Sequence, residues 1–241
     1  MKARPSLKKG LASLPLRSAI FIQPMECPAV SKLPEGSRWL WEIKLDGYRA
    51  IGIKSDRGVR LLSRRNKSFN HQYADIVEAL NELPENTVVD GEVVALDESG
   101  RPNFNLLQNF RNEASRIHFF IFDLLVYEGR DLTRLPMFER REIMRSVLKF
   151  KSPRLRISGY VEASATDILN AVREQGLEGI VGKRKDSLYE PGKRSGAWIK
   201  YRVNLGQELV IGAYIPGTHG LDSIIGGYYK GNDLIYVARV Q

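Results

Sequence analysis

The chain of 241 residues contains a single cysteine, Cys27, and it lacks a long apolar run. A lone cysteine excludes an internal disulfide and any metal cluster built from several thiolates, which fits a reducing compartment. No apolar stretch approaches the ~18 residues that a membrane-spanning helix needs. The basic N-terminus also lacks a sustained apolar core, so it does not predict a signal peptide. These absences favour a cytoplasmic protein without a membrane anchor.

Acidic residues are in deficit, since 28 Asp and Glu stand against 37 Lys and Arg, which gives a net charge of +9. Such an excess favours a polyanionic partner, either a nucleic acid or an acidic membrane surface. No acidic residue precedes Glu26, and residues 1–19 are predicted to form a basic arm. That arm is either a solvated tail or a segment that contacts phosphates. Hydrophobic residues make up 43% of the chain, enough for a sizeable core in one or two domains.

Strand patterns predominate in the first two thirds of the chain, and helical patterns lie between them. Residues 38–44 alternate apolar and polar side chains, and residues 49–63 predict a hairpin around a turn. Apolar side chains at helical spacing predict helices near 76–83, after Pro136 and over 165–175. This mixture predicts an α+β fold that is rich in antiparallel sheet.

The residues after Asn204 show strand signals without a helix. Strands are expected at 208–215, 224–229 and 234–240, with glycine-rich turns between them. We therefore expect a second, small β domain over residues 204–241.

The stretch WEIKLDGYRA places three charged side chains around a glycine where a predicted strand ends. Lys44 is a candidate nucleophile, because an amine kept uncharged by neighbouring cations and partial burial can attack phosphorus. Gly47 would let the backbone turn tightly beside a ligand, and Arg49 could hold a ribose or phosphate. A solvated charged turn explains the same residues, and this stretch alone does not decide between the two.

Carboxylates interrupt two apolar strand patterns. Asp90 and Glu92 flank Gly91 in a valine-rich run, where an unpaired acid is costly. Either they face a ligand near a tight bend, or they mark a turn between two short strands. Glu178 stands in the same way at the start of the apolar run 179–181.

A basic run follows Glu178, with seven cations and two acids between residues 183 and 202. The cations are Lys183, Arg184, Lys185, Lys193, Arg194, Lys200 and Arg202. The interleaved aromatic residues Tyr189, Trp198 and Tyr201 suit contact with phosphates and sugars, and a solvated face is the alternative. Lys200 and Arg202 alternate with apolar residues, so a strand here would present both cations on one side.

The order of the motifs KLDGYR, SRR, DGE, FFIFDLL, EGIV and WIKYR resembles the covalent nucleotidyltransferase superfamily, and most closely the ATP-dependent DNA ligases. The run from Glu178 to Arg202 is similar to ligases of the bacterial end-joining type. The resemblance covers about residues 20–203 as an adenylation domain with an antiparallel-sheet-rich, ATP-grasp-like nucleotidyltransferase fold. Residues 204–241 resemble the start of an oligonucleotide-binding (OB) barrel, which would be incomplete at Gln241.

The resemblance implies a role for each matched residue. Lys44 would attack the α-phosphate of ATP and carry AMP, and Asp46 would act in the sealing step. The residues implied to contact the nucleotide are Glu42, Arg49, Arg64, Glu92, Phe122, Glu178, Lys200 and Arg202. Among these, Glu42 would read the adenine amino group and Phe122 would stack on the adenine.

The remaining matched residues are implied to handle ribose, metal and phosphate. Glu92 and Glu178 would hold ribose or a divalent metal, Mg²⁺ or Mn²⁺. Arg49 and Arg64 would contact ribose, phosphate or the DNA strand. Lys200 and Arg202 would grip the α-phosphate, although Arg202 stands where many relatives have lysine, which keeps the charge and changes its geometry.

The resemblance also implies partners and alternatives. A monomer that acts on nicked double-stranded DNA is expected in a bacterial cytoplasm, associated with the nucleoid, with end-joining proteins as partners. An RNA ligase or a capping-type guanylyltransferase shares the K-x-D-G pattern and stays open, as does a truncated, non-catalytic nick-binding module. The basic motif that follows the barrel in relatives is not found before Gln241, which predicts slow self-adenylation.

Overall fold

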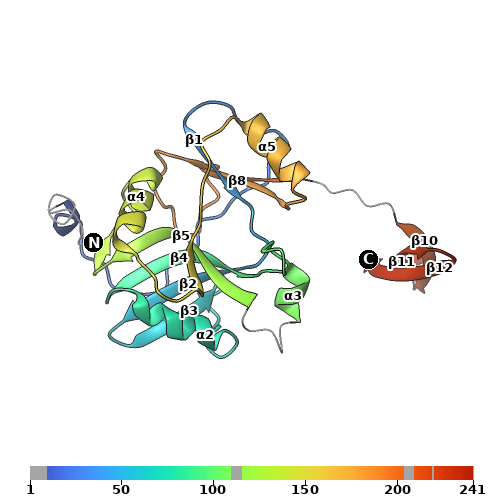
Figure 1. Ribbon diagram of the computed structural model, residues 1–241, viewed down its shortest axis with the longest axis horizontal. Helices are drawn as coiled ribbons and strands as arrows, with labels where there is room; N and C mark the ends of the chain where they lie inside the picture. The colour runs from blue at the N-terminus through green and yellow to red at the C-terminus, as the bar shows by residue number, and fades with distance from the viewer. Residues whose placement is uncertain (1–9, 110–115, 204–208, 219, 241) are drawn as a thin grey trace. The chain divides into compact units, whose positions relative to one another are not determined.

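The computed structural model describes residues 10–109, 116–203, 209–218 and 220–240. The chain divides into two compact units, residues 1–203 and 204–241, and Figure 1 labels the elements of both. Within the described residues, no helix is long and apolar enough to cross a membrane.

A six-stranded sheet forms the centre of the first unit. It contains β2 (Tyr48–Ser55), β3 (Gly58–Ser63), β4 (Thr87–Ala95), β5 (Ile117–Tyr127) and β6 (Arg130–Asp131) in the order β3-β2-β4-β5-β6, with β7 (Leu155–Ile157) beside β5. Only the β5–β7 pair is parallel. The predicted hairpin is confirmed, and β7 was not predicted.

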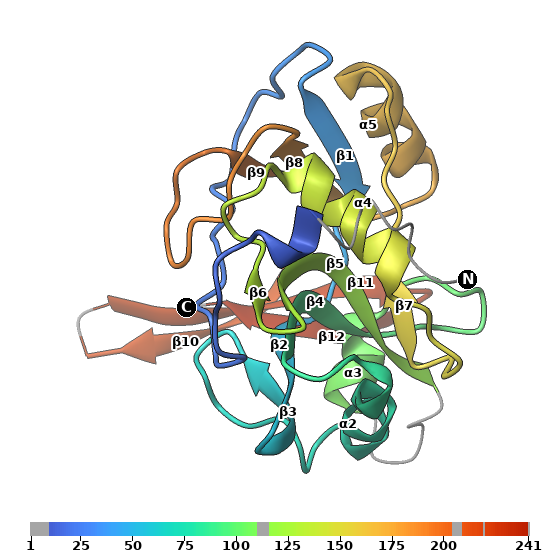
Figure 2. The same cartoon turned by 90° about the vertical axis from the view of Figure 1, so that its left-hand side faces the viewer.

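A second, smaller sheet of the first unit carries Glu42, Lys200 and Arg202. It consists of β1 (Trp39–Ile43), β8 (Gly179–Arg184) and β9 (Trp198–Arg202) in the antiparallel order β1-β8-β9. Helix α5 (Ala165–Glu174) packs against it beside β1, as Figure 2 shows, and buries Ile168 and Val172. Ser164 caps the helix predicted over 165–175, since its side chain accepts a hydrogen bond from the Asp167 N–H.

Both faces of the six-stranded sheet are covered. Ala50 of β2 joins a core cluster with α2 (Ala74–Ala79), while Ile51 and Ile53 point into a second cluster on the opposite face. The helix expected near 76–83 is thus α2, continued by the 3₁₀ turn η1 (Leu80–Glu82). Helix α4 (Met137–Val147) begins directly after Pro136, as predicted, whereas the short α3 (Phe104–Gln108) was not predicted.

The valine-rich segment around Gly91 is one continuous strand, so the interpretation of it as a turn between two strands was wrong. The register between β4 and β5 shifts between Asp90 and Gly91, which marks a bulge. A Cβ atom at position 91 would lie 2.5 Å from the carbonyl oxygen of Phe120. The glycine is therefore required because two strands approach closely at the bulge.

The described part of the expected basic arm is packed against the first unit. Leu11 is 7% exposed and belongs to the core, and Arg17 Nη1 lies 3.2 Å from Asp131 Oδ2. Residues 10–19 are therefore not a free arm, and residues 1–9 lie outside the described residues.

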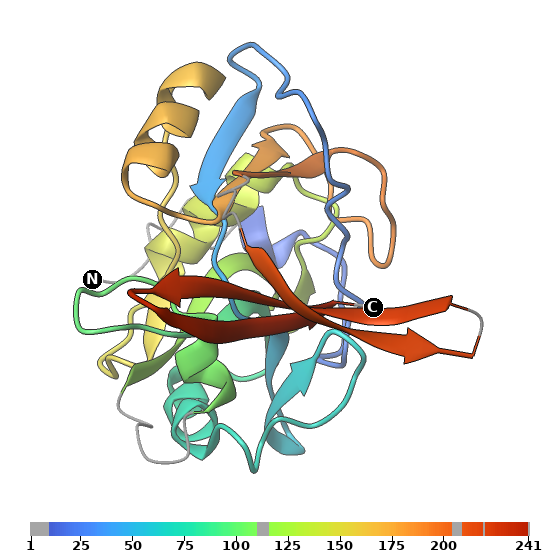
Figure 3. The same ribbon diagram turned by 90° about the vertical axis from the view of Figure 1, so that its right-hand side faces the viewer.

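The second unit is a three-stranded antiparallel sheet, drawn in red in Figure 3. It contains β10 (Val210–Gly217), β11 (Gly220–Lys230) and β12 (Asp233–Val240), which confirms the expectation of three strands without a helix within residues 209–218 and 220–240. Large apolar side chains stay exposed on it, among them Ile211, Tyr214, Leu221 and Tyr236. The described strands form an open sheet, and the OB barrel stays a prediction.

Candidate active site

A pocket of about 630 Å³ is lined by side chains from both sheets of the first unit. The six-stranded sheet contributes residues of β2, β3, β4 and β5, and the smaller sheet contributes residues of β1, β8 and β9. Seven of the predicted site residues line the pocket: Glu42, Lys44, Arg49, Arg64, Glu92, Phe122 and Lys200. The other three, Asp46, Glu178 and Arg202, do not line the pocket. They interact electrostatically with Lys44 or with each other.

Lys44 follows the last residue of β1, and its backbone N–H donates to the carbonyl oxygen of Gly179 at 2.9 Å. Its ammonium group forms an ion pair with Glu178, and Glu178 Oε1 lies 3.4 Å from Arg202 Nε. The structure thus connects Lys44 to Arg202 through one carboxylate. We expected cations to surround Lys44, but the charged group in direct contact is an acid.

Two carboxyl groups near Lys44 are poorly compensated. Burial raises the pKa of Glu92 to about 8, although Arg49 and Lys44 act in the opposite direction. Burial and the neighbouring charge of Glu178 raise the pKa of Asp46, and Lys44 and Arg202 oppose this shift. Both shifts mean that the negative form of these groups lacks sufficient positive charge nearby.

A divalent cation bound near these carboxyl groups would supply the missing positive charge and stabilise their ionised forms. The described residues contain no group of three or more His, Cys, Asp or Glu side chains arranged to hold a metal ion. Glu92 and Glu178 nevertheless interact electrostatically, and the pKa of Glu92 rises partly for that reason. Mg²⁺ usually takes one or two carboxylates together with substrate phosphates, so the residues present fit such an ion once a nucleotide is bound.

Gly47 serves strand packing as well as the site. A Cβ atom at this position would lie 2.2 Å from the carbonyl oxygen of Val93, so no larger residue fits between the segment after Lys44 and β4. We expected a tight turn around a ligand. The close neighbour is instead the protein backbone, which holds Lys44 and Glu92 against the same pocket.

The opposite end of the pocket is buried and densely charged. Glu42 is 4% exposed, and its carboxylate pairs with Arg141 and, at 2.9 Å, with Lys183 Nζ. Arg141 also donates to the carbonyl oxygens of Ser158 at 2.7 Å and Phe122 at 3.3 Å. The residue expected to read adenine is therefore held by two cations.

Lys183 lies between two aromatic rings at this end. Its Nζ is 4.2 Å from the ring centroids of both Phe122 and Trp198, and the residue is 2% exposed. Burial lowers the pKa of Lys183, and the Glu42 carboxylate opposes that shift. The ring of Phe122 remains half-buried, so part of it faces the pocket.

Arg49 is held by a fully buried carboxylate. Its Nε and Nη2 donate to the two oxygens of Asp90 at 3.0 and 2.6 Å, and its guanidinium carbon lies 5.2 Å from the Phe122 ring. Burial acts to lower the pKa of Arg49, but Asp90 outweighs it and raises the pKa above its usual value. Arg64 is next to Arg49 in space, because its N–H donates to the Arg49 carbonyl oxygen at 3.2 Å.

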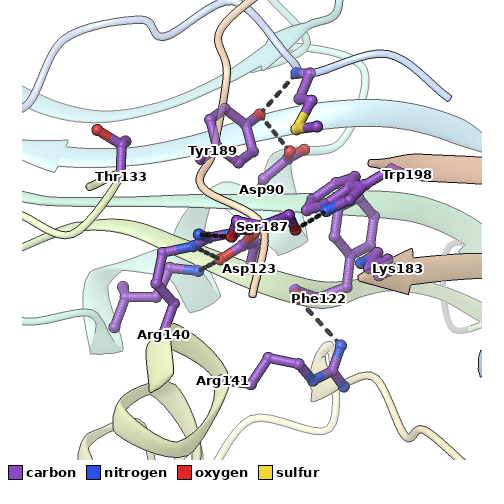
Figure 4. Close-up of polar contacts among 12 residues, drawn as sticks. Asp90, Phe122, Asp123, Thr133, Arg140, Arg141, Lys183, Ser187, Tyr189 and Trp198 are labelled. Atoms are coloured by element: carbon purple, nitrogen blue, oxygen red, sulfur yellow. Dashed lines mark hydrogen bonds and ion pairs between the residues drawn. The ribbon is translucent and has the colours of Figure 1, made fainter. Parts of the chain in front are cut away.

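Two of the three aromatic residues of the basic run are core residues, which corrects the expectation that they contact phosphates and sugars, whereas Tyr201 is half-buried. Tyr189 is 3% exposed and Trp198 is 0% exposed, and Figure 4 shows both packed around the Ser187 segment. The indole Nε1 of Trp198 donates to Ser187 Oγ at 3.3 Å. Lys183 is buried as well, so part of this basic run lies inside the protein.

Residues 24–202 match the family model of the ATP dependent DNA ligase domain. The chain belongs to this family. The family assignment agrees with the antiparallel-rich α+β architecture and with the pocket around Lys44.

Two curated proteins illustrate the similarity of this ligase-family chain. The multifunctional non-homologous end joining protein LigD of Mycolicibacterium smegmatis is 36% identical over 212 residues, 86% of this chain and 27% of that protein. LigD of Pseudomonas aeruginosa is 36% identical over 216 residues, 88% of this chain and 25% of that protein. This chain therefore spans about a quarter of the length of these relatives.

Two solved structures share the fold. A mycobacterial DNA ligase D complexed with ATP and MES aligns with a TM-score of 0.70 at 31% identity, over 91% of this chain and 72% of that chain. The ligase domain of Mycobacterium tuberculosis LigD aligns with a TM-score of 0.65 at 31% identity, over the same shares.

Sequence reasoning about this ligase-family domain missed Lys183 as a pocket residue and Arg141 as the partner of Glu42. Two adjacent arginines in an amphipathic helix usually mark its solvent face, yet Arg140 and Arg141 are both 0% exposed. Arg140 binds Asp123 at 2.6 Å, and both side chains are fully buried. Lys183 had one usable signal, because it directly follows the apolar part of β8 (Gly179–Arg184), but the sequence analysis grouped it with the basic run.

Proposed function

We propose that this chain is the catalytic domain of an ATP-dependent DNA ligase that carries AMP on Lys44 and seals nicks in double-stranded DNA. The observation that supports it best is the Lys44–Glu178 ion pair, which places a lysine beside a pocket lined by Arg49, Glu92 and Phe122. The chain also belongs to the family of ATP dependent DNA ligase domains, which agrees with a ligase reaction that uses ATP.

In the first step, Lys44 Nζ attacks the α-phosphorus of ATP. A nitrogen–phosphorus bond forms, the bond to the bridging oxygen breaks, and pyrophosphate leaves. The attacking amine must first lose a proton, and Glu178 is the acceptor in direct contact with it. Arg49 and Lys200 line the pocket and would balance the charge that develops on the phosphates.

The buried end of the pocket suits an adenine ring. Glu42 offers a hydrogen-bond acceptor and Lys183 a donor, which matches the amino group and ring nitrogen along one edge of adenine. Phe122 is the half-buried aromatic side chain beside them, available for stacking. Arg141 would orient the Glu42 carboxylate.

Glu92 and Glu178 are the residues that would hold Mg²⁺ or Mn²⁺ together with the nucleotide phosphates. A bound divalent ion would supply positive charge to those phosphates. The raised pKa of Glu92 supports this role, because the group gains a countercharge when it ionises beside a cation.

Two further transfers complete the proposed reaction. AMP passes from Lys44 to the 5′-phosphate of the nick, and the 3′-hydroxyl then attacks that phosphate so that AMP leaves. Asp46, whose pKa is raised by burial and Glu178, would accept or orient the proton of the 3′-hydroxyl. Arg64 and Arg202 would contact the nucleotide or the DNA strand.

The biological setting is proposed from the net charge of +9 and from the relatives named in end joining. A monomer acting in a bacterial cytoplasm at the nucleoid, with end-joining proteins as partners, fits both. Residues 1–203 would form a nucleotidyltransferase domain of the ATP-grasp-like kind, and residues 204–241 would contribute strands of an OB fold. Binding to nicked duplex should weaken with salt, at a log–log slope of about −4 to −5 if about five cations meet phosphates.

The test is covalent labelling followed by sealing. Incubation with Mg²⁺ and ATP labelled at the α-phosphate should give an acid-labile label that peptide mapping assigns to Lys44, and a nicked duplex should then be joined. GTP should label poorly, because its ring presents a donor where adenine presents an acceptor. Labelling by GTP instead of ATP, or label on a different lysine, would reject the proposal.

A further inference from the structure

A buried tyrosine outside the predicted site is bonded to the residue that holds Arg49. The Tyr189 hydroxyl donates to Asp90 Oδ2 at 2.6 Å and accepts from the backbone N–H of Met25 at 3.1 Å. Figure 4 shows the Tyr189 hydroxyl directed at the Asp90 carboxylate. Asp90 in turn holds Arg49 through two hydrogen bonds, so the contacts form an unbroken chain from Met25 to the pocket.

We propose that Tyr189 is a positioning residue whose hydroxyl orients Asp90 and, through Asp90, aims the guanidinium of Arg49 at the phosphates of the bound nucleotide. The inference rests on the proposed function, in which Arg49 contacts that nucleotide. Tyr189 lies in the connection between β8 and β9, and the sequence predicted for it only a general contact with phosphates and sugars, not this positioning role.

The position of Asp90 makes its orientation sensitive to each donor. The residue is 0% exposed, so water cannot replace a lost hydrogen bond. Its Oδ2 accepts from both Arg49 Nη2 and the Tyr189 hydroxyl, each at 2.6 Å. Removal of the hydroxyl would leave this oxygen with one donor and would allow the carboxylate to rotate with Arg49.

The Tyr189 hydroxyl must be protonated to donate a hydrogen bond to Asp90, and its surroundings favour the protonated form. Burial and the Asp90 carboxylate raise the pKa of Tyr189 well above its usual value. The hydroxyl therefore carries its proton at neutral pH and can donate to Asp90.

The ring of Tyr189 is held independently of its hydroxyl. Its backbone N–H donates to the Thr133 carbonyl oxygen at 3.0 Å, and its ring packs edge-on against Trp198 with centroids 5.6 Å apart. The guanidinium of Arg140 lies 5.7 Å from the same ring. Tyr189→Phe keeps all of these contacts and removes only the oxygen, so it isolates the proposed role.

The experiment is a double-mutant cycle on the whole chain. ATP dissociation constants and single-turnover adenylation rates are measured for the wild type, Tyr189→Phe, Arg49→Gln and the double variant. We expect Tyr189→Phe to weaken ATP binding or slow adenylation by about tenfold, the effect of losing a hydrogen bond to a charged group. In the Arg49→Gln background the same change should have less than about a twofold effect, because the group that it aims is absent.

Tyr73→Phe is the matched control. Tyr73 is also 3% exposed, its hydroxyl accepts from Gln72 Nε2 at 3.1 Å, and its ring packs edge-on against Phe69, which lines the pocket. This variant should bind and react like the wild type. If Tyr189→Phe folds too poorly to measure, Asp90→Asn interrupts the same chain and should show the same dependence on Arg49.

The outcomes separate the two claims. Wild-type activity in Tyr189→Phe, or an equal loss in both Arg49 backgrounds, overturns the positioning role. A wild-type chain that binds ATP without forming a covalent adduct rejects the proposed function, and the dissociation constants then decide the role of Tyr189 by themselves. A loss that depends on Arg49 supports the inference in either case.

Discussion

The two ends of the pocket differ in how their charges are compensated. At the buried end, Glu42 is paired with both Arg141 and Lys183. At the Lys44 end, Glu178 is shared between two cations, while Glu92 and Asp46 have raised pKa values because burial outweighs the positive charge near them.

This difference separates a fixed region from a reactive one. A buried charge with matched partners holds its geometry, which suits recognition of a rigid base. Carboxyl groups with perturbed pKa values and few partners concentrate where charge must be moved or a cation bound. The four predictions below would break or sharpen this contrast, from the largest expected effect to the smallest.

Replacing Lys44 should cause the largest effect. Lys44→Ala removes the nucleophile, so covalent AMP labelling should fall below detection while the thermal unfolding midpoint stays close to that of the wild type. Lys54→Ala is the control, since Lys54 lies on β2 and its side chain donates to the Asn81 carbonyl oxygen at the surface. Equal labelling of the wild type and Lys44→Ala would show that Lys44 is not the nucleophile.

Loss of the shared carboxylate should be the next largest effect. Glu178→Ala removes the partner of both Lys44 and Arg202, and we expect adenylation to slow by about 100-fold or more at saturating ATP. The rate is measured across a Mg²⁺ titration. Glu174→Ala, an exposed position on α5, should react normally. A Glu178→Ala rate that Mg²⁺ restores fully would assign the carboxylate to metal affinity alone.

Neutralising Glu42 should mainly affect stability. Glu42→Gln leaves Arg141 and Lys183 buried without their carboxylate, and breaking a buried ion pair in this way costs about 3–5 kcal/mol. Urea denaturation measures the loss. Glu162→Gln breaks the more exposed pair with Lys185 and should cost less than about 1 kcal/mol. Similar losses of unfolding free energy in the two variants would contradict the claim that the buried ion pairs of Glu42 fix this end of the pocket.

The smallest effect should be the pH dependence from Glu92. Its pKa is about 8 in the folded protein against 4.5 ordinarily, so the folded state retains a proton that the unfolded state loses between these values. Folding stability from this group is therefore undiminished below about pH 4.5 and falls as the pH rises towards 8.

Denaturation at several pH values checks this prediction. Glu92→Gln should gain about 1–3 kcal/mol relative to the wild type between pH 5 and pH 8. Glu98→Gln is the control, because the Glu98 side chain is 85% exposed. Mg²⁺ with ATP should shrink the gain, since a cation stabilises ionised Glu92, and a gain unaffected by them would argue against a metal at this residue.

Much of the fold was readable from local patterns. The hairpin of β2 and β3, the helix after Pro136 and the Ser164 cap all follow from turn chemistry and side-chain period, which act over a few residues. The bulge at Gly91 was not predicted, and a turn between two strands was one of the two interpretations left open, because sequence alone does not distinguish a glycine that bends a chain from one that admits a neighbouring strand.

The candidate site likewise has features that the sequence predicted and features that only the structure revealed. The sequence by itself singled out the candidate residues: the possible nucleophile Lys44, the acids Glu92 and Glu178, and the alternating cations Lys200 and Arg202, because motif spacing along one strand or loop is a local property. It also determined a basic protein with strands in its last 38 residues, as the second unit shows.

Only the tertiary structure decided which charges are buried and paired. Arg141, Lys183 and Tyr189 come from a helix, a strand and a connection that are far from Glu42 and Asp90 in sequence, and each is enclosed by residues of other elements. Burial and ion pairing depend on what packs around a side chain after the chain has folded. A run of arginine, lysine or tyrosine reads the same in a sequence whether the fold exposes it to solvent or places it beneath the nucleotide pocket.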